Sequence, residues 1–179
     1  MLSAYEKDYA LRDRISSSMA AAIDYFIAYA GCDKDGNQKP DSPMKGGLVV
    51  FAAGNDGIAN GVPASYAPVI AVGASGMTGR LSSFSNYGSW VDICAPGESI
   101  YSCVASGSYD RYQGTSMACP HVSGALALLL SQFGGEGFTN ENLKEVLLEG
   151  ANASLINYNG KAMGPYLCLL YTSDAADDS

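Results

Sequence analysis

Helix-like and strand-like hydrophobic patterns alternate along the first half of the chain. Between residues 11 and 30, apolar residues recur every three to four positions, which predicts an amphipathic helix that ends at Gly31. Uninterrupted apolar runs follow at residues 47–54 and 69–75, and each has the length of a strand. Strands without polar alternation are typical of a parallel sheet that is covered on both faces. The pattern therefore predicts an α/β domain with a buried, mainly parallel sheet.

The second half of the chain predicts short strands followed by two helices. Strand-like pieces occur at residues 90–93 and 99–104, on either side of a turn. From Met117 to Phe133 apolar residues cover nearly the whole circumference, which predicts a helix that is buried on all sides. A last helix is predicted over residues 140–149, with Thr139 as its N-cap.

The composition is that of a folded globular domain. Of the 179 residues, 47% are hydrophobic and 16% are charged, as expected for a chain with a packed core. The net charge of −8 at pH 7 offers no basic patch to phosphates, so we expect no nucleic-acid partner. No apolar run approaches the roughly 18 to 20 residues of a membrane span, so none is expected.

The segment CLLYTSDAADDS, residues 168–179, continues none of these patterns. It resembles the translated read-through of a sequencing adapter, so we interpret it as a non-native tail. A frayed acidic terminus is the alternative. The predicted domain therefore spans residues 1–167, with no internal repeat or linker.

Ser116 lies where the glycine-flanked segment YQGTSMACPH meets the predicted buried helix. Backbone N–H groups at a helix start stabilise an anion, so a nucleophile at this place has electrostatic support. A serine N-cap without chemistry is the alternative. The single histidine, His121, follows five residues later, roughly 140° away around a helix. His121 is therefore poorly placed as a base for Ser116, and we expect a packed or capping residue.

Four segments of the chain carry a family resemblance. They are VVFAAGNDG, VPASYAPVIAVGAS, LSSFSNYGSWVDICAPGESIYSC and GTSMACPHVSG. Together they resemble the subtilisin-like serine proteases, peptidase family S8, and they follow each other in that family's order. The resemblance extends from about residue 10 to about residue 165.

The resemblance implies roles for six residues. Ser116 matches the nucleophile, and Asn55 matches the asparagine whose side-chain amide binds the oxyanion together with the Ser116 N–H. Asparagine in an ordinary Asn-Asp-Gly turn is the alternative for Asn55. The other implied positions line the S1 substrate pocket, with Ala52, Ala53 and Gly54 as one wall and Gly61 as part of its floor.

The resemblance also implies a three-layer α/β/α subtilisin-like fold with a mainly parallel sheet. In this family the catalytic aspartate and histidine precede the serine, and neither has a counterpart in this sequence, where His121 matches the family's non-catalytic histidine. We therefore expect a fragment, the carboxyl-terminal part of a peptidase domain, whose missing partner is the amino-terminal half of that domain.

The implied activity is that of a serine endopeptidase, which cleaves a peptide or protein substrate through an acyl-enzyme. The fragment itself is expected to be inactive, because it lacks a base. By resemblance, the parent protein is expected to be secreted or located at the cell surface. A non-catalytic relative that binds peptides in the same cleft is the alternative function.

Two further patterns suggest ligands. Glycines 73, 76 and 79 follow a predicted strand, as in a dinucleotide-binding loop, but no helical period follows them, so an NAD(P)-binding oxidoreductase is a remote alternative. Asp33, Asp35 and Asn37 suggest a calcium loop but lack its glycine at position six and its glutamate at position twelve. No cofactor or metal is therefore assigned, and calcium remains an option for the parent protein only.

The cysteines show no metal-binding spacing. Cys94 and Cys103 flank a predicted turn, so two interpretations stay open for them. They either form a disulfide or are small buried residues.

Overall fold

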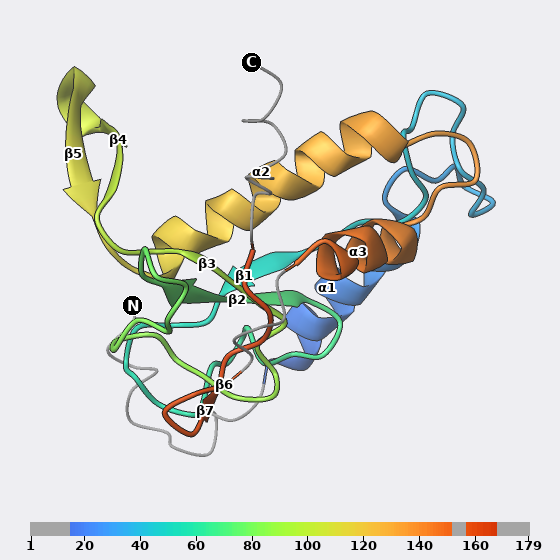
Figure 1. Cartoon of the computed structure of the whole chain (residues 1–179). Coiled ribbons are helices and arrows are strands. Elements are labelled where there is room, and N and C mark those ends of the chain that lie inside the picture. The colour runs from blue at the N-terminus through green and yellow to red at the C-terminus, as the bar shows by residue number, and fades with distance from the viewer. Residues whose placement is uncertain (1–14, 152–156, 168–179) are drawn as a thin grey trace.

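The computed structural model describes residues 15–151 and 157–167 (Figure 1). Its elements are α1 (Ser17–Tyr29), β1 (Val50–Ala52), β2 (Ile70–Ser75), β3 (Ile93–Pro96), β4 (Ile100–Val104), β5 (Ser108–Tyr112), α2 (Thr115–Phe133), α3 (Asn140–Glu149), β6 (Asn157–Tyr158) and β7 (Lys161–Ala162). In this described part of the chain, no helix is both long and apolar enough to cross a membrane. The predicted tail at 168–179 lies outside the described residues.

Strands β1, β2 and β3 form one parallel sheet in the order β1-β2-β3. The predicted α/β class with a parallel sheet is therefore confirmed. All six residues of β2 are buried, as its unbroken apolar run predicted. The prediction was wrong for β1, whose three residues are only half-buried. The reason is position, because β2 has a strand on each side, whereas β1 pairs with β2 alone among the described residues.

Helix α1 is shorter than predicted. It begins after Ser16, whose hydroxyl oxygen accepts the N–H of Met19 at 3.3 Å and so caps the first turn. Ile15 therefore precedes the helix, and the predicted start at residue 11 lies outside the described residues. The chain leaves the helix through Gly31, whose φ of +70° favours glycine.

Helix α2 confirms the predicted helix but not its complete burial. It packs on all three strands of the parallel sheet and on α3, and this face buries Thr115, Ala118, Val122, Ala125 and Leu126. Away from this face, Leu128 is 70% exposed. A helix with apolar residues on all sides is fully buried only if other elements pack on all sides. In the described structure, elements pack against one side of α2 only.

Helix α3 begins and ends where the sequence predicted. The Thr139 hydroxyl oxygen accepts the N–H of Asn142 at 3.2 Å, and the Asn142 side-chain oxygen accepts the Thr139 N–H at 3.2 Å. This reciprocal pair is a capping box. Leu143 and Leu147 then point into the core, where each is 2% exposed.

The segment between the sheet and α2 forms an exposed hairpin. Strands β4 and β5 pair antiparallel, and the hairpin extends away from the sheet (Figure 1). The prediction identified β4 but missed β5, whose five residues are all exposed. The strand predicted at 90–93 begins only at Ile93 and continues to Pro96.

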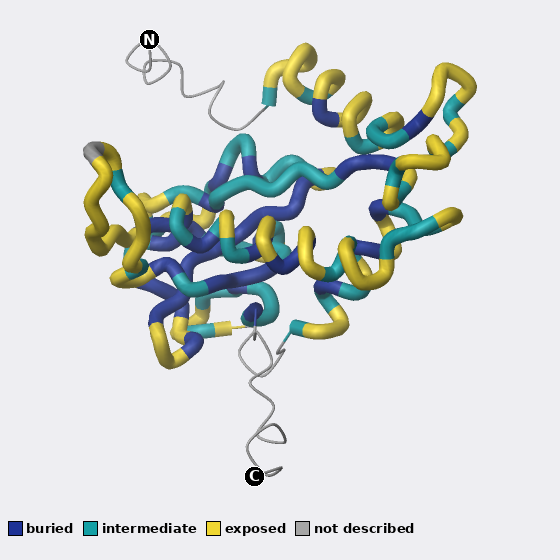
Figure 2. Tube along the Cα trace, turned by 90° about the horizontal axis from the view of Figure 1, so that it is seen from above, coloured by how far each residue is buried: buried dark blue, intermediate teal, exposed yellow. Residues whose placement is uncertain are grey.

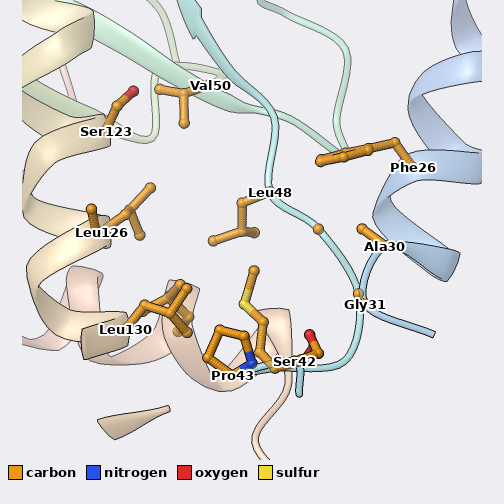
Figure 3. Close-up of a pocket in the computed structure, with 15 residues that line it drawn as sticks. Phe26, Ala30, Gly31, Ser42, Pro43, Leu48, Val50, Ser123, Leu126 and Leu130 are labelled. Carbon is orange, nitrogen blue, oxygen red and sulfur yellow. The ribbon is translucent and has the colours of Figure 1, made fainter. Parts of the chain in front are cut away.

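Helices α1 and α2 lie on opposite sides of the segment that leads into β1 (Figure 3). An apolar hollow of about 320 Å³ lies between them, and its lining includes Phe26, Leu48, Leu126 and Leu130. Helix α1 thus provides a layer beyond the sheet segment, on the side away from α2.

The two alternative ligand patterns have structural explanations. Gly73 lies inside β2, and a tight turn follows in which the Gly79 N–H donates to the Gly76 carbonyl at 3.0 Å. No helix opens there in the described chain, so the dinucleotide interpretation loses its anion-binding element. The Asp33 carboxylate accepts the N–H groups of Asn37 and Asp35, and these bonds lower its pKa.

Cys94 and Cys103 are both free thiols, so the disulfide alternative is wrong. Cys94 is buried in β3 and donates to the Met163 carbonyl at 2.8 Å. Burial raises the pKa of the Cys94 thiol to about 12. Cys103 is exposed on the hairpin, so the alternative of a small buried residue holds for Cys94 alone.

Candidate active site

Ser116 is the second residue of α2 and is exposed. Gly114 precedes the helix with a φ of +147°, a conformation that residues with a side chain rarely adopt. Two hollows meet at Ser116. One, of about 730 Å³, lies beside the loop that follows β1. The other, of about 390 Å³, lies beside the β4–β5 hairpin.

The side-chain orientation of Asn55 is determined by Thr115. The Asn55 Oδ1 atom accepts the backbone N–H of Thr115 at 2.8 Å and its hydroxyl at 3.0 Å. A backbone N–H can only donate, so Asn55 must turn its oxygen toward Thr115. Its Nδ2 group then remains as a donor in the larger hollow, where it bonds to none of the described residues.

A second donor lies close to Asn55 Nδ2. The N–H of Ser116 belongs to the first turn of α2, where backbone N–H groups lack helical partners. An ideal Cβ atom on Gly114 would lie 3.5 Å from Asn55 Nδ2, 3.6 Å from Asn55 Oδ1 and 3.7 Å from the Ser116 nitrogen. Because residue 114 is glycine, that space is open, and two N–H donors border it. Two N–H donors beside one open space can stabilise a negatively charged oxygen.

Thr115 connects the helix start to the loop after β1. It is fully buried, and its Oγ1 atom accepts the Gly54 N–H at 3.1 Å while donating to Asn55. Sequence reasoning assigned no role to Thr115. The available signal was its place between Gly114 and Ser116, where a β-branched hydroxyl residue has low helix propensity and must have another use.

Asn86 was also missed, although it is 3% exposed and bonds directly to the loop after β1. Its Oδ1 atom accepts the N–H groups of Asp56 at 3.0 Å and Ile58 at 3.2 Å. Its Nδ2 group donates to the Ala53 carbonyl at 3.1 Å. In the sequence it is a loop asparagine among serines, and no periodic pattern marks it.

The positions expected to bind substrate lie together. The larger hollow is bordered by all six predicted site residues, namely Ser116, Asn55, Ala52, Ala53, Gly54 and Gly61. Its walls carry small side chains, and Asp56 contributes a charge at an exposed position. Gly61 packs directly on the Trp90 ring, so a side chain at residue 61 would displace the indole.

His121 lies near Ser116 without bonding to it. Its Nδ1 atom bonds to the Met117 carbonyl at 2.8 Å, one helical turn earlier. The ring borders the smaller hollow, which Ser116 also borders. Among the described residues none accepts or donates a hydrogen bond at the Ser116 hydroxyl.

Comparisons with known proteins agree with the family resemblance and the fold. A model of the Subtilase family matches residues 10–165, so the chain belongs to the subtilase family. It is 49% identical over 109 residues to thermophilic serine proteinase from Bacillus sp. (strain AK1), covering 60% of this chain and 26% of that protein. It is 43% identical over 131 residues to subtilisin NAT from Bacillus subtilis subsp. natto, covering 69% of this chain and 34% of the relative.

Among solved structures, the chain is similar to a cold adapted subtilisin-like serine proteinase, with a TM-score of 0.68 and 30% identity. That similarity covers 87% of this chain and 51% of the solved one. The chain therefore spans about a quarter to a third of these curated relatives, and about half of the solved structure that it matches.

Proposed function

We propose that this chain carries the nucleophile and the oxyanion-binding group of a serine endopeptidase. The observation that carries the proposal is the open space over Gly114, bordered by Asn55 Nδ2 and the Ser116 N–H beside an exposed serine hydroxyl. The buried Thr115 holds the amide in place, so the donors are oriented before any substrate arrives. Preorganised donors of this kind stabilise the transition state more than the ground state.

In the proposed reaction, Ser116 Oγ attacks the carbonyl carbon of a peptide bond. A C–O bond forms, the carbonyl oxygen becomes an oxyanion over Gly114, and the serine proton passes to a histidine base. The C–N bond then breaks and the base returns the proton to the leaving amine. Water attacks the resulting acyl-enzyme in the same way and releases the carboxylate.

We propose that the base comes from outside these 179 residues. His121 is the only histidine in the sequence, and its Nδ1 atom bonds to the Met117 carbonyl. The hollow beside the hairpin, about 390 Å³ in volume, offers room for another imidazole next to Ser116. We therefore propose that an upstream part of the same peptidase domain supplies the histidine and its aspartate, and that residues 1–167 alone are inactive.

The proposed substrate is an extended peptide whose P1 side chain enters the larger hollow. Ala52, Ala53, Gly54 and Gly61 bring no charge to this space, which favours apolar P1 residues. Asp56 adds a minor preference for Lys or Arg, since an exposed charge contributes only about 0 to 1 kcal/mol. The family relationship supports a secreted or cell-surface parent protein.

The second candidate function is peptide binding without catalysis. It has the same cleft, so it differs only in whether the upstream histidine and aspartate exist. The parent sequence decides between the two, and a parent without this pair contradicts the endopeptidase proposal.

The test is active-site labelling with a fluorophosphonate probe. The purified chain is expected to remain unlabelled, because without a base the Ser116 hydroxyl is a poor nucleophile at neutral pH. The complete gene product is expected to be labelled, and its Ser116→Ala variant is expected to lose the label. Labelling of the isolated chain that depends on Ser116 would show that the base lies within this sequence. Labelling of the complete protein that survives Ser116→Ala would refute the proposed nucleophile.

A further inference from the structure

The loop that carries Asn55 has a buried partner that none of the proposed chemistry uses. Asn86 lies in the segment between β2 and β3, and its side chain bonds to the loop that follows β1. It is 3% exposed and borders the larger hollow, but its amide bonds to the loop backbone. Three of the four hydrogen-bonding roles of its amide, two as acceptor and one as donor, are filled from residues 53–58.

The bonds of Asn86 lie on both sides of Asn55. Before Asn55, the Asn86 Nδ2 group donates to the Ala53 carbonyl and its backbone N–H donates to the Gly54 carbonyl at 2.9 Å. After Asn55, the Oδ1 atom accepts from Asp56 and Ile58. Asn55 itself makes no bond to Asn86 in the described structure, so any influence on it passes through the backbone.

Gly54 permits this close approach. Its φ is +104°, and an ideal Cβ atom there would collide with the Asn86 amide nitrogen. The Gly54 N–H on the other side donates to Thr115 Oγ1. The loop is therefore bound from two directions, by Asn86 and by the start of α2.

We infer that Asn86 is a positioning residue for the oxyanion donor. It holds residues 53–58 in the turn that places Asn55 Nδ2 beside the open space over Gly114. Without it, two N–H groups and one carbonyl group of a partly buried loop lose their partners and the turn relaxes. This inference rests on the proposed function of Asn55, and it adds that the oxyanion donor depends on an amide 31 positions later in the sequence.

The chain contains a matched control in Asn140, a buried asparagine that also donates to backbone carbonyls but lies away from the site. It is 5% exposed, and its Nδ2 group donates to the carbonyls of Ile27 at 3.0 Å and Gly47 at 2.9 Å. A merely structural clamp predicts the same consequences for Asn86→Ala and Asn140→Ala. A positioning role predicts a difference in catalysis.

The first experiment measures kcat and KM of variants of the complete, active protein. Asn86→Ala is expected to lower kcat about 10- to 100-fold with KM changed less than about threefold, because the lost interaction exists only in the transition state. Asn140→Ala is expected to leave kcat within about threefold. In an Asn55→Ala background, Asn86→Ala is expected to have little further effect, because both act through one amide. Equal losses in Asn86→Ala and Asn140→Ala, or fully additive losses with Asn55→Ala, overturn the inference.

A conservative variant covers the case in which Asn86→Ala does not fold. Asn86→Asp keeps the acceptor for the N–H groups of Asp56 and Ile58 and replaces the donor to Ala53 by a carboxylate oxygen, which cannot donate when ionised. It is expected to retain more kcat than Asn86→Ala where both fold, and to lose less than about tenfold in any case. A loss as large as that of Asn55→Ala would show that the two accepting bonds do not position the donor.

The second experiment uses the chain as it is and needs no activity. Hydrogen exchange of the Asp56 and Ile58 amides is expected to become at least about tenfold faster in Asn86→Ala and to stay unchanged in Asn140→Ala. Unchanged exchange at both amides refutes the clamp itself. If instead Asn55→Ala leaves kcat unchanged while exchange responds to Asn86→Ala, the clamp stands and the proposed oxyanion role of Asn55 fails.

Discussion

The two sides of Ser116 are built in different ways. On the Asn55 side, buried Asn86 and Thr115 bind the loop through hydrogen bonds to several backbone groups. On the hairpin side, all five residues of β5 are exposed, and the hairpin is held mainly by its own strand pairing (Figure 2). Buried, fully bonded polar groups cost much when disturbed, whereas exposed side chains cost little. The comparison indicates that the Asn55 side is preformed and that the hairpin side can adapt.

The largest expected difference is in cysteine reactivity. At neutral pH, alkylation of the native chain is expected to modify exposed Cys103 on the hairpin and to modify buried Cys94 far more slowly. Burial raises the pKa of Cys94 to about 12, against an ordinary value of 9.0, so its thiolate is correspondingly rare. Mass spectrometry of peptides after timed alkylation measures both rates. Comparable rates at the two thiols would show that β3 is not buried in solution.

The raised pKa of Cys94 predicts the direction in which the stability of the folded chain changes with pH. Because the folded chain holds this proton more tightly, its stabilising contribution is complete below pH 9.0 and is lost as the pH rises toward about 12. Denaturant unfolding between pH 9 and 12 should therefore show a steeper loss of stability than in the Cys94→Ala variant. Parallel slopes in the two proteins would contradict the assignment.

Removing the oxyanion donor should have the next largest effect. For Asn55→Ala in the complete protein we expect kcat to fall about 10²- to 10³-fold with KM little changed, the loss known for the equivalent donor of subtilisin. Steady-state kinetics on a peptide substrate measures it. An unchanged kcat would remove Asn55 from the oxyanion site.

Removing the Thr115 hydroxyl, which orients the Asn55 amide, should lower kcat less than removing the amide itself. Thr115→Val deletes the hydroxyl that accepts from Gly54 and donates to Asn55, so we expect kcat to fall about tenfold and stability to fall by about 1 to 3 kcal/mol. Thr115→Ser retains the hydroxyl and should restore most of the activity. A Ser variant as impaired as the Val variant would indicate that the methyl group, and not the hydroxyl, matters.

The smallest effect is expected on the hairpin. Tyr101 is 62% exposed, stacks on Tyr109 at a centroid distance of 5.7 Å and lies under the Arg111 guanidinium. Tyr101→Ala should lower the free energy of unfolding by less than about 1 kcal/mol, and should leave probe labelling of the complete protein unchanged. A larger loss in either measurement would show that the hairpin is not the adaptable side.

Local patterns predicted those parts of the fold that depend on neighbours in the sequence. The boundaries of α3 followed from Thr139 and the apolar positions after it, and the burial of β2 followed from its unbroken apolar run. The half-burial of β1 and the exposed face of α2 could not be predicted in this way. The burial of β1 and of this face of α2 depends on which other elements pack against them. Residue type alone does not reveal that packing.

The residues of the candidate site likewise fall into two groups, those that the sequence predicted and those that it did not. Ser116, Asn55 and the four pocket positions were found through motifs, and they do line one hollow. Asn86 and Thr115 were missed, because their value lies in bonds to residues about 30 and 60 positions away. The sequence shows that an asparagine side chain can donate and accept hydrogen bonds. Only the folded structure shows which groups are its partners.

These long separations have a consequence for the order of events during folding. Closing the loop between Asn55 and Thr115 joins residues 60 positions apart, whereas the hairpin and α3 need only local contacts. Contacts of high sequence separation carry the larger entropic cost and form late. A partly folded chain can therefore contain its helix and its hairpin while the space over Gly114 lacks a donor. Under the proposed function, a chain still emerging during synthesis would therefore lack the Asn55 donor of its oxyanion site.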